Sequence, residues 1–84
     1  MVEVLRERLS SLKPIALDIE DESYRHAGHE GARDGGHYNL RIVAEVFTGK
    51  STVARHRLIY AATDDLMRCG IHALSVSALA PDEV

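Results

Sequence analysis

Hydrophobic residues recur along the chain with two periods, one typical of helices and one typical of strands. Near the N-terminus they recur every three or four residues between charged side chains. This spacing predicts a short amphipathic helix that ends before Pro14 and whose apolar stripe is Val2, Leu5, Leu9 and Leu12. Residues 15–20 alternate instead, which predicts a half-buried strand with Ile15, Leu17 and Ile19 on its inner side.

The alternation returns in residues 37–46 and predicts a second strand, which pairs with the first as a long-looped hairpin over residues 15–46. The residues expected to point inward from this strand are Tyr38, Leu40, Ile42 and Ala44. In residues 71–79 a third alternating segment predicts a third strand, in which His72 shares the side of Leu74, Val76 and Ala78. A partly buried, hydrogen-bonded core histidine is therefore one interpretation of His72.

Between the second and third strands, helical spacing predicts a helix from Val53 to about Arg68. Its apolar stripe is Leu58, Ala62, Leu66 and Cys69. Ser51 or Thr52 is available as its N-cap, and Gly70 is expected to end it in a left-handed conformation.

The predicted order is α-β-β-α-β, which defines an α+β fold with a three-stranded mixed sheet. A right-handed crossover through the second helix places the third strand parallel to the second and both helices on one face. A chain of 84 residues is expected to form one domain over residues 1–84.

Composition narrows the choice of partners. The formal net charge of −3 disfavours a dedicated nucleic-acid binder, because phosphate contacts need a basic surface. The apolar runs are far shorter than the roughly 20 residues of a membrane span, and the charged N-terminus does not resemble a signal peptide. A single cysteine fits a reducing compartment, so a cytoplasmic or organelle-matrix location without a membrane partner is expected.

Candidate chemistry is concentrated in residues 26–37, which hold three histidines and four glycines. Histidine is a common metal ligand, but the spacing of His26, His29 and His37 is loose and lacks the cysteines of structural zinc sites. A metal site and an incidentally histidine-rich loop both remain open.

Other motifs give weaker signals. The Gly-Lys-Ser of residues 49–51 is the tail of a phosphate-binding loop, but Ala44 stands where that motif needs glycine, so a turn is expected. His29 and Glu30 begin a zinc-protease motif that Arg33 breaks. Cys69 is expected to be a buried thiol. The chain shows no paired carboxylates or activated nucleophile, which disfavours an enzyme.

A basic cluster, Arg55, His56 and Arg57, lies on the first turns of the second predicted helix. It is either a solvated helix face or a patch for an acidic partner or phosphates.

Three segments resemble the BolA family, in order and over nearly the whole chain: DESYRH at residues 21–26, FTGKS with RHRLIY within residues 47–60, and HAL at residues 72–74. The resemblance implies a class II KH-like fold, which agrees with the order predicted above. The family often ends with proline, two acidic residues and tryptophan, whereas this chain has Val84 in the last position.

The resemblance further implies a non-enzymatic partner of a monothiol glutaredoxin, the kind with a CGFS active site, in iron–sulfur trafficking or in iron and redox regulation. The two proteins would share a 2Fe–2S cluster, for which the glutaredoxin supplies its cysteine and the thiolate of bound glutathione. This chain would supply His72 from the HAL strand and one loop histidine: His26 first, then His37, then His29. The isolated protein is expected to hold no cluster tightly and to have a mobile loop at residues 25–36. A homodimer is left open.

The alternative is a nucleic-acid-binding transcriptional regulator that uses the KH-like fold and binds DNA. Its phosphate contacts would be Lys50, Arg55 and Arg57. The turn of residues 47–50 has one glycine, so it does not supply the GxxG clamp of KH domains.

Overall fold

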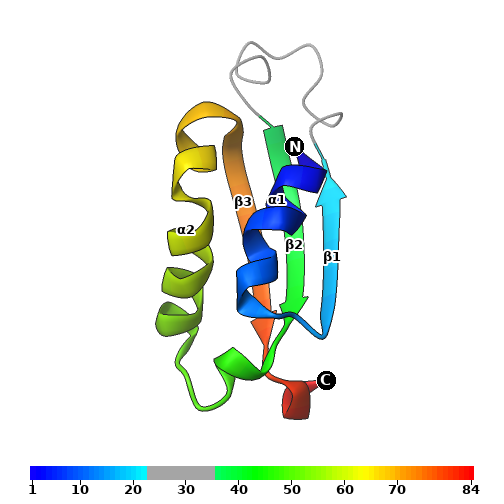
Figure 1. The fold of residues 1–84 in the computed structure, drawn as a ribbon, viewed down its shortest axis with the longest axis vertical. Coiled ribbons are helices and arrows are strands. Elements are labelled where there is room, and N and C mark those ends of the chain that lie inside the picture. Colours follow the sequence, from blue (N-terminus) through cyan, green and yellow to red (C-terminus); the bar gives the residue numbers. More distant parts are fainter. Residues whose placement is uncertain (23–35) are drawn as a thin grey trace.

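The computed structural model describes residues 1–22 and 36–84 of the chain. In this part of the protein two helices, α1 (Val2–Leu9) and α2 (Thr52–Cys69), lie on the same side of a sheet of three strands (Figure 1). The strands are β1 (Ala16–Asp21), β2 (Gly36–Val43) and β3 (Ile71–Leu79). Short 3-10 helices follow α1, β2 and β3 at Ser10–Leu12, Glu45–Phe47 and Pro81–Glu83. Within these ranges, neither helix is long and apolar enough to cross a membrane.

The sheet has β2 at its centre. β1 pairs with β2 in antiparallel fashion, with Leu17 opposite Ile42, and β3 pairs with the other side of β2 in parallel, with Val76 opposite Leu40. Because α2 carries the chain back along the sheet before β3 begins, β3 runs in the same direction as β2. The predicted α+β fold with a mixed sheet is therefore confirmed.

The core lies between the helices and the sheet face that they cover. The inward side of β2 is buried as predicted, and Phe47, which follows it, is fully buried. The buried apolar residues on this side include Leu5, Leu9, Tyr38, Leu40, Ile42, Ala44, Phe47, Ile59, Leu66, Ile71 and Ala80.

The buried stripe of α2 differs from the predicted one. Ile59 and Thr63 are fully buried, whereas Leu58 and Ala62 are half-buried, so the helix is rotated relative to the expectation. Thr63 is tolerated in the core because its hydroxyl donates a hydrogen bond of 3.0 Å to the Ile59 carbonyl oxygen one turn earlier. A polar residue type concealed this core position in the sequence.

The ends of the elements follow the predicted signals in part. The Ser51 hydroxyl oxygen accepts a hydrogen bond of 3.2 Å from the Ala54 amide, which confirms the N-cap of α2. Gly70 follows α2 as expected, but its φ of −160° shows that the left-handed conformation was wrong. The expectation for Ile15 was also wrong, because this residue precedes β1 and is 63% exposed.

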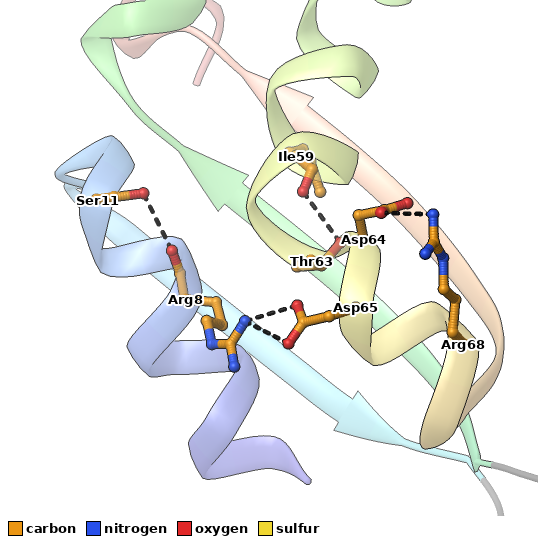
Figure 2. A network of polar contacts seen from close by, with 7 residues as sticks. All are labelled: Arg8, Ser11, Ile59, Thr63, Asp64, Asp65 and Arg68. Atoms are coloured by element: carbon orange, nitrogen blue, oxygen red, sulfur yellow. Dashed lines mark hydrogen bonds and ion pairs between the residues drawn. The ribbon is translucent and has the colours of Figure 1, made fainter.

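An ion pair joins the two helices on the surface (Figure 2). The Arg8 guanidinium donates to both carboxylate oxygens of Asp65, at 2.6 and 2.7 Å. The hydrogen bond from Arg8 lowers the pKa of Asp65 below its ordinary value. Because both side chains are exposed, the pair is screened by solvent, and it orients α1 against α2 more than it stabilises the fold.

Candidate metal-binding site

A bulge at the start of β3 decides where His72 points. Gly36 of β2 lies opposite Ile71 and His37 lies opposite Ala73, so β3 has one extra residue between these two pairs. Ile71 is 3% exposed and packs with the core, and Leu74 packs against the same core. His72 and Ala73, which lie between Ile71 and Leu74, therefore both point away from the helices.

His72 is consequently exposed on the sheet face that the helices leave open. The expectation that it shares the side of Leu74, Val76 and Ala78 was wrong, because simple alternation fails across a bulge. The interpretation of His72 as a partly buried core histidine is wrong for the same reason.

His37 lies beside His72 on the neighbouring strand. The two imidazole rings have their centres 5.0 Å apart and are tilted by 44°. Two imidazoles that bind one metal ion through nitrogens at about 2.1 Å, at a roughly tetrahedral angle, have ring centres about 5 Å apart. The spacing of His37 and His72 thus fits two ligands of a single metal.

The backbone around His37 is fixed on both sides. Gly36, just before it, donates a hydrogen bond of 3.1 Å to the Gly70 carbonyl oxygen at the end of α2. A Cβ at Gly36 would lie only 2.5 Å from the ring of buried Tyr38, so this position requires glycine. On the β1 side, the Glu22 amide donates to the His37 carbonyl oxygen at 2.8 Å, which places Glu22 opposite His37 across the strands.

Two predicted ligands, His26 and His29, lie outside the described residues. The same holds for residues 25–35 of the loop that was expected to be mobile, and for the side chain of Cys69. Over residues 1–22 and 36–84, no group of three or more histidine, cysteine or acidic side chains is arranged to hold a metal ion. The site that the described part offers consists of two imidazoles. Further ligands for a metal there would come from elsewhere.

The basic residues of the nucleic-acid hypothesis have different surroundings. Arg55 is only 12% exposed and is held by the C-terminal segment: it donates to the Ala78 carbonyl oxygen at 3.0 Å and to Glu83 at 2.6 Å. It also donates to the Lys50 carbonyl oxygen at 3.0 Å. Lys50 and Arg57 are exposed, and the His56 ring meets Tyr60 edge to face, with centres 6.3 Å apart. Arg55 is therefore a structural residue rather than part of a solvated face.

Fold and site together define a small α+β domain that presents two paired histidines at one end of an open sheet face. The family model of the BolA-like protein matches residues 9–83. The chain belongs to the BolA family.

Individual relatives agree with this assignment. SufE-like protein 1, chloroplastic/mitochondrial, of Arabidopsis thaliana is 51% identical, with 95% of this chain and 24% of that protein covered. Protein BOLA1, chloroplastic, of the same plant is 43% identical over 94% of this chain and 52% of its own length. A solved structure of BolA1 from Arabidopsis thaliana superposes with a TM-score of 0.88 at 39% identity, covering 100% of this chain and 95% of that one.

The chain thus spans about a quarter and about half of the length of these two plant proteins. A more distant relative, at 32% identity over 87% of this chain and 72% of its own length, is the DNA-binding transcriptional regulator BolA of Escherichia coli. Apart from the SufE-like protein, these relatives are named as BolA proteins or as a regulator, and none of the names describes an enzymatic reaction.

Proposed function

We propose that this protein is the BolA-type partner of a monothiol glutaredoxin and contributes two histidines to a 2Fe–2S cluster that the two proteins share. The observation that supports the proposal is the 5.0 Å spacing of the His37 and His72 rings on an exposed surface. Two protein ligands are too few for an iron–sulfur cluster, which fits a cluster completed by a cysteine and a glutathione thiolate from the partner.

The residue types suit a transferable cluster. A neutral imidazole in place of a thiolate removes negative charge, and such a ligand raises the reduction potential of the cluster, as in Rieske centres. An imidazole can also take up a proton near neutral pH, and a protonated imidazole cannot bind a metal, so histidine ligands make a cluster easier to release. These properties fit a role in iron–sulfur trafficking or in iron and redox regulation.

The bulge in β3 turns His72 to the open face of the sheet. The distance of 5.0 Å between the two ring centres supports His37 as the second ligand. His26 and His29 stay open as alternatives, because the loop that carries them lies outside the described residues. The organelle names of the two plant relatives favour an organelle matrix over the cytosol as the place where this protein acts.

The proposal is tested by mixing the protein with a cluster-loaded CGFS glutaredoxin and recording visible absorption and circular dichroism. The wild-type protein is expected to change both spectra, and His72→Ala is expected to abolish the change. His56→Ala is the matched control, because it removes an imidazole from α2 and leaves the β3 site intact. Wild-type spectra that equal those of the glutaredoxin alone would defeat the proposal.

A nucleic-acid-binding role is the second candidate, favoured by the name of the Escherichia coli relative. Arg55 is committed to the C-terminal segment, so phosphate contacts would rest on Lys50 and Arg57. Binding of this kind weakens steeply with salt. The slope of affinity against salt is expected to fall in a Lys50→Gln, Arg57→Gln variant; affinity for DNA that is independent of salt would exclude this role.

A further inference from the structure

On the helix side of the sheet, behind the histidine pair, one aromatic ring lies against a glycine. Tyr38 follows Gly36 by two residues on β2, and same-side positions of a strand are about 6.6 Å apart. The Tyr38 ring nevertheless reaches Gly36, because a Cβ there would lie 2.5 Å from its Cε2 atom and 2.8 Å from its Cζ atom. The ring therefore leans back along β2 and occupies the volume of the side chain that Gly36 lacks.

The Tyr38 ring is enclosed by its surroundings. It is 8% exposed and packs in one cluster with Leu5 of α1, Leu66 of α2 and Ile71 of β3, all buried. Protein interiors are packed closely, so a ring in such a cluster has no free volume to turn into. A side chain at position 36 would therefore displace the backbone of Gly36 rather than the ring.

This contact lies next to the bulge that brings the histidines together. The register between β2 and β3 shifts just after Gly36 and Ile71. His37 and His72 are the next residues on the two strands, and their rings have centres 5.0 Å apart. The Tyr38 ring packs against Gly36 on one strand, and Ile71 belongs to the same cluster on the other. Each strand is thus fixed on its helix side one residue before its histidine.

We infer that the close fit of the Tyr38 ring against Gly36 positions His37 beside His72, so that Gly36 and Tyr38 are positioning residues of the histidine pair. This inference rests on the proposed function and adds the residues that set the separation of the two ligands. Two nitrogens that bind one metal at about 2.1 Å leave little freedom in the distance between their rings. Ligands that their surroundings already hold in place also lose less conformational entropy when the metal binds.

The test measures nuclear Overhauser cross-peaks between the two imidazole rings in the free, isotope-labelled protein. Wild type is expected to show cross-peaks between the carbon-bound ring protons of His37 and His72. Gly36→Ala is expected to lose most of their intensity, because the new Cβ would meet the Tyr38 ring. The double variant Gly36→Ala, Tyr38→Leu is expected to recover them, since a leucine side chain ends short of the ring atoms that the Cβ would meet. Tyr38→Phe keeps those ring carbons and is expected to match wild type.

Gly70→Ala is the matched control. Gly70 accepts the hydrogen bond of 3.1 Å that the Gly36 amide donates, so this variant adds the same methyl group at the other end of that bond. The close contact of a Cβ there is with the end of the Met1 side chain, which is 40% exposed and can turn away. The cross-peaks of Gly70→Ala are therefore expected to equal those of wild type.

Three results would overturn the inference: cross-peaks that Gly36→Ala leaves unchanged, equal losses in Gly36→Ala and Gly70→Ala, or a loss that Tyr38→Leu does not reverse. If Gly36→Ala alone does not fold, the double variant decides, because it is expected to regain both the fold and the cross-peaks. A double variant that folds without the cross-peaks would contradict the positioning role.

The two proposals fail separately, because the cross-peaks are measured without glutaredoxin or cluster. Cross-peaks that ignore Gly36→Ala, in a protein that does change the spectra of the loaded glutaredoxin, refute the positioning alone. Cross-peaks that respond as expected, in a wild-type protein that leaves those spectra unchanged, refute the shared cluster and leave the positioning in place.

Discussion

Arg55 is predicted to be a stability determinant rather than a ligand-binding residue. Its guanidinium ties the N-terminal turn of α2 to the end of β3 and to the final 3-10 helix through the carbonyl oxygens of Lys50 and Ala78 and the carboxylate of Glu83. Glu83 in turn accepts a hydrogen bond of 2.6 Å from the Ala80 amide. Replacement of Arg55 by methionine keeps much of the aliphatic stem and removes all the hydrogen bonds that the guanidinium donates.

The expected cost follows from the two bonds to main-chain carbonyls. A hydrogen bond from a charged donor contributes about 1.5 kcal/mol at the low end of the usual range, so the two bonds are worth about 3 kcal/mol at a side chain that is 12% exposed. The ion pair with Glu83 adds little, because that carboxylate is 41% exposed and screened by water. For a domain of this size, a loss of about 3 kcal/mol lowers the melting temperature by roughly 12–24 °C.

Urea unfolding followed by far-ultraviolet circular dichroism measures this loss. The control is Arg57→Met, which changes an exposed arginine two residues away and is expected to alter the free energy of unfolding by less than about 0.5 kcal/mol. Equal stabilities for the two variants would refute the reasoning, since they would mean that the contacts of Arg55 do not contribute to the fold.

Two further predictions concern the same end of the molecule. The hydrogen bond from Arg55 lowers the pKa of Glu83 below its ordinary value of 4.5; this contribution to stability is therefore present above about pH 4.5 and lost as the pH falls through the folded-state pKa. An NMR titration of the Glu83 carboxyl should return toward 4.5 in Arg55→Met, and an unchanged midpoint would contradict the assignment of the cause. Ser51→Ala should cost about 1 kcal/mol in urea unfolding by removing the N-cap of α2, whereas exposed Ser75→Ala should change stability by less than about 0.5 kcal/mol; equal effects would argue against the cap.

Local patterns in the sequence predicted the elements well, because burial enforces them. The predicted bounds of the third strand, residues 71–79, are those of β3, and the inward side of β2 is buried at each predicted position. Features that depend on contacts between distant segments were not predictable in this way. In the sequence, Arg55 is one of three adjacent basic residues at positions 55–57. Only the fold brings the end of β3 and Glu83 into contact with it.

The histidine site shows the same limit more sharply. Strict alternation placed His72 on the helix side, whereas one extra residue in β3 opposite β2 moves it to the open face beside His37. Nothing in the sequence of β3 alone marks the bulge, because it arises from the register with Gly36. The hairpin pairing, in contrast, could have identified Glu22 as the residue opposite His37, since the register of β1 and β2 runs without a shift.

The most direct test of the central claim, that His37 and His72 together bind one iron, counts the histidine nitrogens on the cluster. The protein is labelled with 15N-histidine, combined with an unlabelled cluster-loaded CGFS glutaredoxin and reduced, and the nitrogen couplings are measured by pulsed electron paramagnetic resonance. Two coordinated labelled nitrogens are predicted for the wild type and one for His37→Ala. Two nitrogens that persist in His37→Ala would assign the second ligand to another histidine, and none in the wild type would contradict the account.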